Sequence, residues 1–312
     1  MPSVSIIVTT YRHESFIERT LQSLLDQTYT DLEILIGDDS PDEKTWRIIE
    51  SFIENHPGII RAWHHTSNKG IVGNMNFLIE QVHSKSSYIA FLEGDDMWSR
   101  NYLEKKLSIW KDHPGIWLIY NELSTIDQYD TVIERRFIAP RTRKWYQNEI
   151  DTIWNFLVSD MVCFSYSTLM VRREIVKKIR DFDRSDLMGS ESDFWMQIGS
   201  VHPIYGISEP LTYYRRHAQN TSKNLTKSIS HFEFLIQKYR EYQYINALDF
   251  RKMEIIVSMM RAFVDLQNRD FQWALRYILQ CLSYSFWHSM ILGLRALCYR
   301  LIRPFVFRIF DL

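Results

Sequence analysis

Short apolar runs alternate with amphipathic segments from residue 4 to residue 120. Continuous runs of β-branched and other apolar residues are typical of strands buried on both faces of a sheet. Five such runs predict strands, at residues 4–8, 32–37, 59–64, 87–92 and 116–120. Apolar residues at helical spacing between them predict helices at residues 15–27, 44–55, 74–83 and 101–110. The alternation predicts an α/β fold with a Rossmann-like, mostly parallel sheet and helices on both faces.

The remainder of the chain is less regular. Strands are predicted at residues 163–172 and 204–216, with a short helix at 193–199. Residues 134–148 carry four arginines and a lysine and predict an edge strand with a loop, which is either a solvated basic loop or a contact for phosphate or anionic lipid. Helical periodicity prevails from residue 223, so we expect one domain at 1–222 and a helical C-terminal extension at 223–312.

The C-terminal tail predicts an amphipathic pair of helices. Residues 271–312 contain five arginines and one acid, with aromatic and aliphatic residues between them. Such helices either cap the main domain or lie on a membrane surface. Peripheral membrane contact through this tail is therefore one expectation, and ordinary packing is the other.

Composition narrows the function classes. The 312-residue chain has a net charge of −1, so it lacks the basic footprint of a nucleic-acid-binding protein. Its three cysteines have no CxxC spacing, which indicates reduced thiols and no structural zinc. No basic stretch typical of a signal peptide begins the sequence, and no run of about 18 apolar residues predicts a membrane span. A cytoplasmic location is expected.

Polar residues follow three of the predicted strands at their carboxyl ends. They are Thr9 and Tyr11 after the first strand, Asp38 and Asp39 after the second, and Glu93, Asp95 and Asp96 after the fourth. Ligands of open α/β sheets bind at that edge, and carboxylates suit Mg²⁺ or Mn²⁺ bridged to a substrate phosphate. A solvated acidic turn is the alternative for the last group.

These motifs resemble the inverting family 2 glycosyltransferases, which have the nucleotide-diphospho-sugar transferase (GT-A) fold. The resemblance covers residues 3–222. Its motifs, in chain order, are VSIIVTTY, Gln27-Thr28-Tyr29, ILIGDDS, Asn68-Lys69-Gly70 with Asn76, FLEGDDMW, Glu191-Ser192-Asp193-Phe194-Trp195 and Tyr214-Arg215-Arg216-His217. The order and spacing of the motifs together make this resemblance specific.

The resemblance implies a nucleotide-sugar site. Thr9, Tyr11 and Asp39 would hold the base and ribose, and Asn68 and Asn76 would bind backbone or sugar, with helix capping as the alternative.

A metal site is implied beside the nucleotide. Asp95 and Asp96 would serve the ribose and the metal-bound diphosphate, with Asp96 as the direct metal ligand. His217 would help to hold the Mn²⁺ or Mg²⁺, and the role of Glu93 stays open because its side chain is longer than the Asp found at this position in relatives.

The resemblance also implies that a third acidic motif would supply the catalytic base. Glu191 aligns with the general base of the family, where relatives carry an Asp, and Asp193 is the alternative. A base of this kind takes the proton of the acceptor hydroxyl while the hydroxyl oxygen attacks the anomeric carbon.

The expected activity is that of an inverting, metal-dependent glycosyltransferase. It would move a sugar from a nucleotide-diphosphate donor to a glycan or lipid-linked acceptor in cell-surface polysaccharide or glycolipid synthesis, at the inner membrane face. A sugar nucleotidyltransferase would require a glycine-rich loop after the first strand, and residues 10–14 contain no glycine. The other alternative is a catalytically inactive nucleotide-sugar-binding or scaffolding protein.

Overall fold

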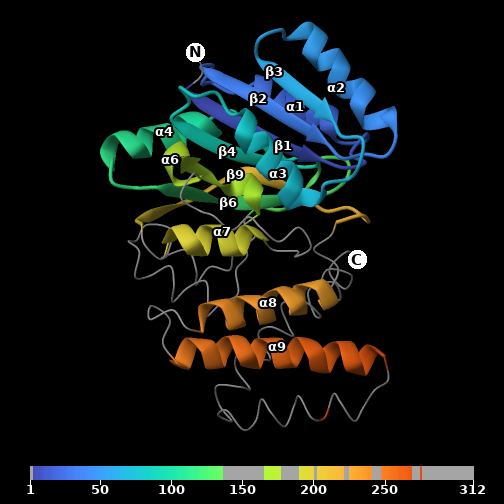
Figure 1. Cartoon of the computed structure of the whole chain (residues 1–312), viewed down its shortest axis with the longest axis vertical. Helices are drawn as coiled ribbons and strands as arrows, with labels where there is room; N and C mark the ends of the chain where they lie inside the picture. Colours follow the sequence, from blue (N-terminus) through green and yellow to red (C-terminus); the bar gives the residue numbers. More distant parts are fainter. Residues whose placement is uncertain are drawn as a thin grey trace. The chain divides into compact units, whose positions relative to one another are not determined.

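The computed structural model describes residues 3–135, 165–176, 190–199, 202–220, 225–240, 247–268 and 275. The chain forms two compact units. The larger unit holds every described strand and the helices up to residue 199, and the smaller unit holds the two helices that follow Asn220 (Figure 1).

The first half of the sheet in the larger unit is parallel. Strands β1 (Val4–Thr10), β2 (Leu32–Asp38), β3 (Ile60–His64) and β4 (Tyr88–Glu93) lie in the order β3-β2-β1-β4. All three pairings between them are parallel, with β1 in register against both β2 and β4. Their carboxyl ends therefore meet at one edge, as the sequence predicts.

The second half of the sheet is mixed. Beyond β4 the order continues β8-β6-β9-β5, and β7 pairs with β6. Among these pairings only β6 with β9 is parallel. The bounds are Met97–Trp98 for β5, Leu118–Ile126 for β6, Val132–Glu134 for β7, Met170–Arg172 for β8 and Ile204–Arg215 for β9.

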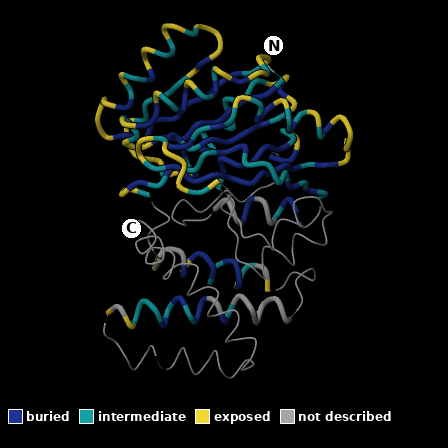
Figure 2. The backbone as a smooth tube through the Cα atoms, turned by 180° about the vertical axis from the view of Figure 1, so that it is seen from behind, coloured by how far each residue is buried: buried dark blue, intermediate teal, exposed yellow. Residues whose placement is uncertain are grey.

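Helices cover both faces of the sheet. On one face α1 (Ile17–Leu25), α2 (Glu43–Asn55) and α4 (Tyr102–Asp112) share a buried cluster with alternate residues of β1, β2 and β4. On the other face α3 (Gly70–Gln81) packs on β1 and β2, and α7 (Ser190–Gly199) reaches the Phe91 ring of β4. The sheet interior is continuously buried, whereas most exposed positions lie on helices and turns (Figure 2).

Two expected elements differ from the structure, and a third lies almost entirely outside the described residues. Residues 166–168 form the 3₁₀ helix η2 (Tyr166–Thr168), so β8 is only three residues long, followed by the one-turn helix α6 (Arg173–Val176). Helix α3 starts at Gly70 rather than at residue 74, and the Asn68 side chain accepts from the Gly70 N–H. Residues 136–164, including the basic loop and Cys163, lie outside the described residues.

The smaller unit contains helices α8 (Leu225–Tyr239) and α9 (Ala247–Gln267). Phe232 and Leu235 of α8, like Ile255 and Met260 of α9, are buried, and Arg261 forms an ion pair with Glu233. No described helix is both long and apolar enough to span a bilayer. The larger unit ends at Asn220, and the expected domain boundary at residue 222 stays a prediction. The tail at 271–312 lies outside the described residues except for Leu275.

A fully buried lysine ties α4 to the sheet. Lys106 Nζ donates to the carbonyls of Thr168 (2.6 Å) and Ile119 (3.2 Å) and lies 4.2 Å from the centre of the Tyr102 ring. No described carboxylate forms an ion pair with it. Burial lowers the pKa of Lys106 well below its ordinary value, because the desolvated ammonium is disfavoured.

Replacing Lys106 by Met should remove a contribution that makes the free energy of unfolding rise with pH. Between the lowered native pKa and the ordinary value of about 10.4, the unfolded chain binds more protons at this residue than the native protein does. The wild-type free energy of unfolding should therefore rise with pH, relative to Lys106→Met, through that window. Urea unfolding of both proteins at a series of pH values below about 10 measures the difference. A difference that does not change with pH would contradict the assignment.

Candidate active site

Strand register brings the predicted residues to one edge. Thr9 pairs with Glu93 of β4, and Thr10 pairs with Asp38 of β2. Because β1 lies between β2 and β4, the loop after Thr10 separates Asp39 on one side from the acidic turn after β4 on the other. This edge is the candidate site, as expected from the sequence.

The β2 side of the edge carries two buried carboxylates. Asp38 is fully buried and accepts from the Ser40 N–H (3.0 Å) and hydroxyl (2.6 Å). Asp39 accepts from the Lys69 N–H at 3.1 Å. Burial raises the pKa of both Asp38 and Asp39.

The loop after β1 presents an exposed aromatic side chain. Tyr11 is 41% exposed, and the Arg12 guanidinium lies 5.3 Å from the centre of its ring. Arg12 has a φ of 57°, a left-handed conformation that is uncommon for a non-glycine residue. Its N–H donates to Ser40 Oγ at 2.8 Å, which joins this loop to the turn after β2. Thr9, in contrast, is buried.

Of the two predicted asparagines, Asn68 is exposed and its side chain accepts from the Gly70 N–H at 2.7 Å. Asn76 is half-buried on α3. The sequence analysis missed Asn74, which is buried and donates to the Gly37 carbonyl at 2.8 Å. A Cβ at Gly37 would lie 1.8 Å from Asn74 Oδ1, so the glycine permits this contact beside Asp38. A glycine inside a buried strand was the available signal.

Asp96 connects three parts of the chain. One carboxylate oxygen accepts from the Arg215 N–H of β9 at 2.9 Å, and the other accepts from the Ser167 hydroxyl of η2 at 2.6 Å. Ser167 Oγ also accepts from the Glu93 N–H at 3.1 Å. Asp96 is fully buried, and burial together with the charge of Asp95 raises its pKa well above the ordinary value. It thus anchors the turn, and its predicted role as a metal ligand stays a prediction.

The Arg215 side chain extends the same connection. It is fully buried, donates from Nε to the Asp95 carbonyl at 2.7 Å and forms an ion pair with Asp130 in the turn between β6 and β7. The guanidinium also lies 4.9 Å from the centre of the Phe16 ring. A buried charge must be paired and hydrogen-bonded. These partners satisfy Nε and Nη1 of Arg215, whereas Nη2 is buried without a hydrogen-bond partner among the described residues. Nothing in the sequence distinguished Arg215 from Arg216.

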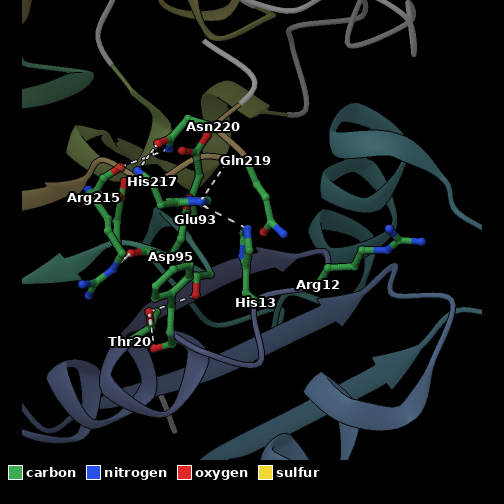
Figure 3. A network of polar contacts seen from close by, with 12 residues as sticks. Arg12, His13, Thr20, Glu93, Asp95, Arg215, His217, Gln219 and Asn220 are labelled. Atoms are coloured by element: carbon green, nitrogen blue, oxygen red, sulfur yellow. Dashed lines mark hydrogen bonds and ion pairs between the residues drawn. The ribbon is translucent and has the colours of Figure 1, made fainter. Parts of the chain in front are cut away.

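Two histidines from distant parts of the sequence approach Asp95. His217, after β9, places Nε2 2.8 Å from Asp95 Oδ2, and His13, after β1, places Nε2 3.8 Å from the same oxygen (Figure 3). Although burial of Asp95 acts in the other direction, these imidazoles hold its pKa below the ordinary value. Burial lowers the pKa of His13. His13 was not predicted, because one histidine before a helix carries no specific signal.

The site offers a donor set suited to a divalent cation. His13, Asp95 and His217 each present one ligand atom, and these atoms lie within 4.8 Å of one another. Glu93, Asp95 and Asp96 form a second group by the same criterion. Imidazole nitrogen and carboxylate oxygen are ligands of Mn²⁺ and related metals. The residues present therefore fit the expected cation.

The predicted base residues lie on α7. Glu191 belongs to the first turn of that helix, and its side chain is outside the described residues. Asp193 is buried and accepts from Gln197 Nε2 at 2.9 Å. The buried Phe194 ring meets Phe91 of β4, so α7 is anchored on the strand that leads into the acidic turn.

Comparison with known proteins decides the family. The sequence profile of "Glycosyl transferase family 2" matches residues 5–180, more than half of the chain. This protein belongs to glycosyl transferase family 2. It is a glycosyltransferase enzyme, as expected from the motifs.

Two relatives of this family 2 chain come from Escherichia coli. The UDP-Glc:alpha-D-GlcNAc-diphosphoundecaprenol beta-1,3-glucosyltransferase WfaP is 29% identical over 73% of this chain and 83% of its own length. Chondroitin synthase is 27% identical over 71% of this chain but only 30% of its own length.

Solved structures confirm the GT-A fold of this family 2 enzyme. The mannosyltransferase PcManGT from Pyrobaculum calidifontis, in complex with GDP-Man and Mn²⁺, has a TM-score of 0.59, with 15% identity over 97% of this chain and 83% of its own. Residues 1–349 of S. aureus TarS have a TM-score of 0.57, with 14% identity over 88% and 89%. These likenesses establish the fold.

Replacing Gly94 by Ala should destabilise the acidic turn. The added Cβ would lie 2.6 Å from Thr10 Cβ and 2.9 Å from His13 Nδ1, so one element must move. Overpacking of this kind costs about 1–3 kcal/mol. Guanidinium unfolding should show that loss. The matched control is Gly115→Ala, whose Cβ meets nothing within 4 Å. Equal stability of the two variants would contradict the close packing.

Proposed function

We propose that this family 2 enzyme is an inverting, divalent-metal-dependent glycosyltransferase. It transfers a sugar from a nucleoside-diphosphate donor to a hydroxyl group in polysaccharide or glycolipid synthesis. The observation that carries this proposal is the meeting of the β1, β2 and β4 ends with the end of β9, because it brings the exposed Tyr11 ring and the Asp39 carboxylate to the same sheet edge as a cation donor set.

The nucleoside is held on the β2 side. The Asp39 carboxylate accepts a hydrogen bond from the base edge, and the exposed Tyr11 ring offers a stacking face. Thr9, Asn68 and Asn76 complete the predicted set.

The diphosphate is held on the β4 side. Asp95 and His217 are the leading residues for a Mn²⁺ or Mg²⁺ ion, and Asp96 is the third residue of the predicted set. When bound, the cation would neutralise the charge that develops on the departing diphosphate. Asp96 and Arg215 keep the Asp95 turn against the end of β9, so that His217 stays beside Asp95.

The acceptor is activated from α7. Glu191 removes the proton of the acceptor hydroxyl. The hydroxyl oxygen attacks the anomeric carbon from the side opposite the diphosphate, which inverts the configuration at that carbon. Position 191 lies three and seven residues before Phe194 and Ile198, and such positions share one helix face. Both of those residues are buried, so this helix face packs on the sheet. Asp193, engaged with Gln197, is the alternative base.

The relatives suggest the biological setting. WfaP is named for transfer of glucose from UDP-Glc to a diphosphoundecaprenol-linked sugar. A lipid-linked or glycan acceptor at the inner face of the cell membrane, with peripheral contact through the C-terminal tail, is the corresponding proposal for this chain.

Donor turnover tests the function directly. Purified enzyme should release nucleoside diphosphate from one member of a panel of UDP-Glc, UDP-GlcNAc and GDP-Man when Mn²⁺ is present. Asp95→Asn should lose that release. No release from any donor, with acceptor glycans supplied, would instead support a binding or scaffolding protein.

Glu191→Gln should separate donor binding from transfer. The amide keeps the size of the side chain but cannot accept the proton, so turnover should fall by about 10²- to 10⁴-fold. Calorimetry should show unchanged binding of the donor. Asp193→Asn is the matched control and should retain transfer. If instead Asp193→Asn loses transfer while Glu191→Gln retains it, Asp193 is the base.

A further inference from the structure

Asp95 belongs to two competing groups of cation ligands. One joins it to Glu93 and Asp96 of its own turn, and the other joins it to His13 and His217. The two groups have different chemistry. Three carboxylates form an all-oxygen site, whereas two imidazoles and one carboxylate form a site that disfavours Mg²⁺.

The hydrogen bonds of Asp96 make its carboxylate less available to bind a cation. Both oxygens already accept a hydrogen bond, from a main-chain N–H of β9 and from the Ser167 hydroxyl, and the side chain is fully buried. A cation on Asp96 would have to compete with the contacts that hold the turn together. Asp96 is therefore better suited to positioning Asp95 than to binding the metal itself.

The imidazole of His13, unlike the carboxylate of Asp96, lacks hydrogen-bond partners among the described residues. Its side chain is only 17% exposed, and its Nδ1 is buried without a hydrogen-bond partner among the described residues. Its Nε2 lies 3.8 Å from Asp95 Oδ2, which is beyond hydrogen-bond distance. Nδ1 faces Gly94, so Nε2 is the ring nitrogen directed at Asp95. Because buried polar groups are nearly always satisfied, a ligand at Nε2 would supply the partner that this imidazole lacks among the described residues.

The absence of a side chain at Gly94 leaves room for the His13 imidazole. A side chain at position 94 would begin 2.9 Å from His13 Nδ1 and 2.6 Å from Thr10 Cβ. The absent side chain lets the imidazole lie against the backbone of the acidic turn. The close-up shows His13 directed toward Asp95 and His217 from the loop after β1 (Figure 3).

We propose that His13 is a direct ligand of the divalent cation, so that the imidazoles of His13 and His217 and the carboxylate of Asp95 hold the metal together. Their ligand atoms lie within 4.8 Å of one another, and the two imidazole rings are nearly perpendicular, with an interplanar angle of 87°. Three protein ligands leave positions open for diphosphate oxygens. This inference rests on the proposed function, because it specifies the cation of that same site.

Ligation changes the hydrogen bonds of His217. In the structure its Nδ1 accepts from the Gln219 N–H at 3.3 Å, so its Nε2 proton points at Asp95. A metal at Nε2 requires that proton to move to Nδ1, which releases the Gln219 amide. At 3.3 Å this bond is longer than most N–H···O or N–H···N bonds. The release therefore costs little.

The donor set also predicts metal preference. Two imidazoles favour a transition metal such as Mn²⁺ over Mg²⁺, which prefers oxygen ligands. His13→Gln replaces one nitrogen ligand by an amide oxygen. The ratio of the Mn²⁺ and Mg²⁺ dissociation constants should therefore move toward one in this variant.

Pulsed electron paramagnetic resonance of Mn²⁺ bound to the full chain counts the bound imidazole nitrogens, with ¹⁵N-histidine labelling to identify them. The wild-type protein should show two nitrogens, and His13→Gln and His217→Gln should each show one. The matched control is His56→Gln, at the end of α2, which should keep two. Calorimetry should show that His13→Gln weakens Mn²⁺ binding at least about 10-fold, the lower end of the loss that even an outer-shell change causes.

His13→Ala provides a second variant. Added imidazole should enter the vacated space and restore both the second nitrogen signal and the Mn²⁺ affinity. One nitrogen in the wild-type protein, or two in folded His13→Gln, would overturn the role of His13. Because the wild-type count needs no variant, it decides the proposal even if both substitutions prevent folding.

The outcomes separate this inference from the proposed function. Sugar transfer with only one bound nitrogen would overturn His13 ligation and leave the transferase function intact. Two bound nitrogens without transfer from any donor would support His13 ligation and contradict the transferase function.

Discussion

The whole site depends on the attachment of the end of β9 to the turn after β4. Arg215 makes this attachment twice, through its N–H to the Asp96 carboxylate and through its guanidinium to the Asp95 carbonyl. All of these groups are buried, so the hydrogen bonds act in a medium where they are strong and where leaving them unmade is costly. This attachment and the pairing of β5 with β9 together hold His217 beside Asp95.

The fold explains why such an attachment is needed. Parallel strands β1, β2 and β4 bring their carboxyl ends together by register alone, but His217 comes from a strand more than a hundred residues later in the chain. Strand β5 follows the acidic turn at once and pairs with β9 at Tyr213 and Thr212. This pairing places residues 215 and 217 beside the turn. The hydrogen bond from the Arg215 N–H to Asp96 holds them in that position.

The parallel half of the sheet, and the edge at which its strands end, could be predicted from the sequence. Continuous apolar runs strongly indicate buried strands. The acids that follow these runs must lie at the strand ends, so their place at the sheet edge follows directly. The role of Asp96 could not be predicted, because alternation along a strand does not show where the chain turns or what it meets. Ser167 lies in a segment expected to be a strand, and it became a partner of Asp96 only through the η2 turn.

The remaining misses share a cause. His13 and Lys106 are polar residues at positions where local pattern predicts a solvated side chain, and tertiary packing buries them instead. Asn74 was passed over for Asn76, since only the structure shows which side of α3 faces Gly37. The base, by contrast, was inferred from the resemblance, and the side chain of Glu191 is not among those described.

The central claim is that the nucleotide side and the cation side form one site. The most direct test is calorimetry of UDP or GDP, whichever binds, with and without Mn²⁺. If the two share a site, Mn²⁺ tightens nucleotide binding, and the nucleotide tightens Mn²⁺ binding by the same factor. Asp95→Asn should abolish this coupling and leave metal-free nucleotide binding in place. Equal nucleotide affinity with and without Mn²⁺ in the wild-type protein would contradict the account.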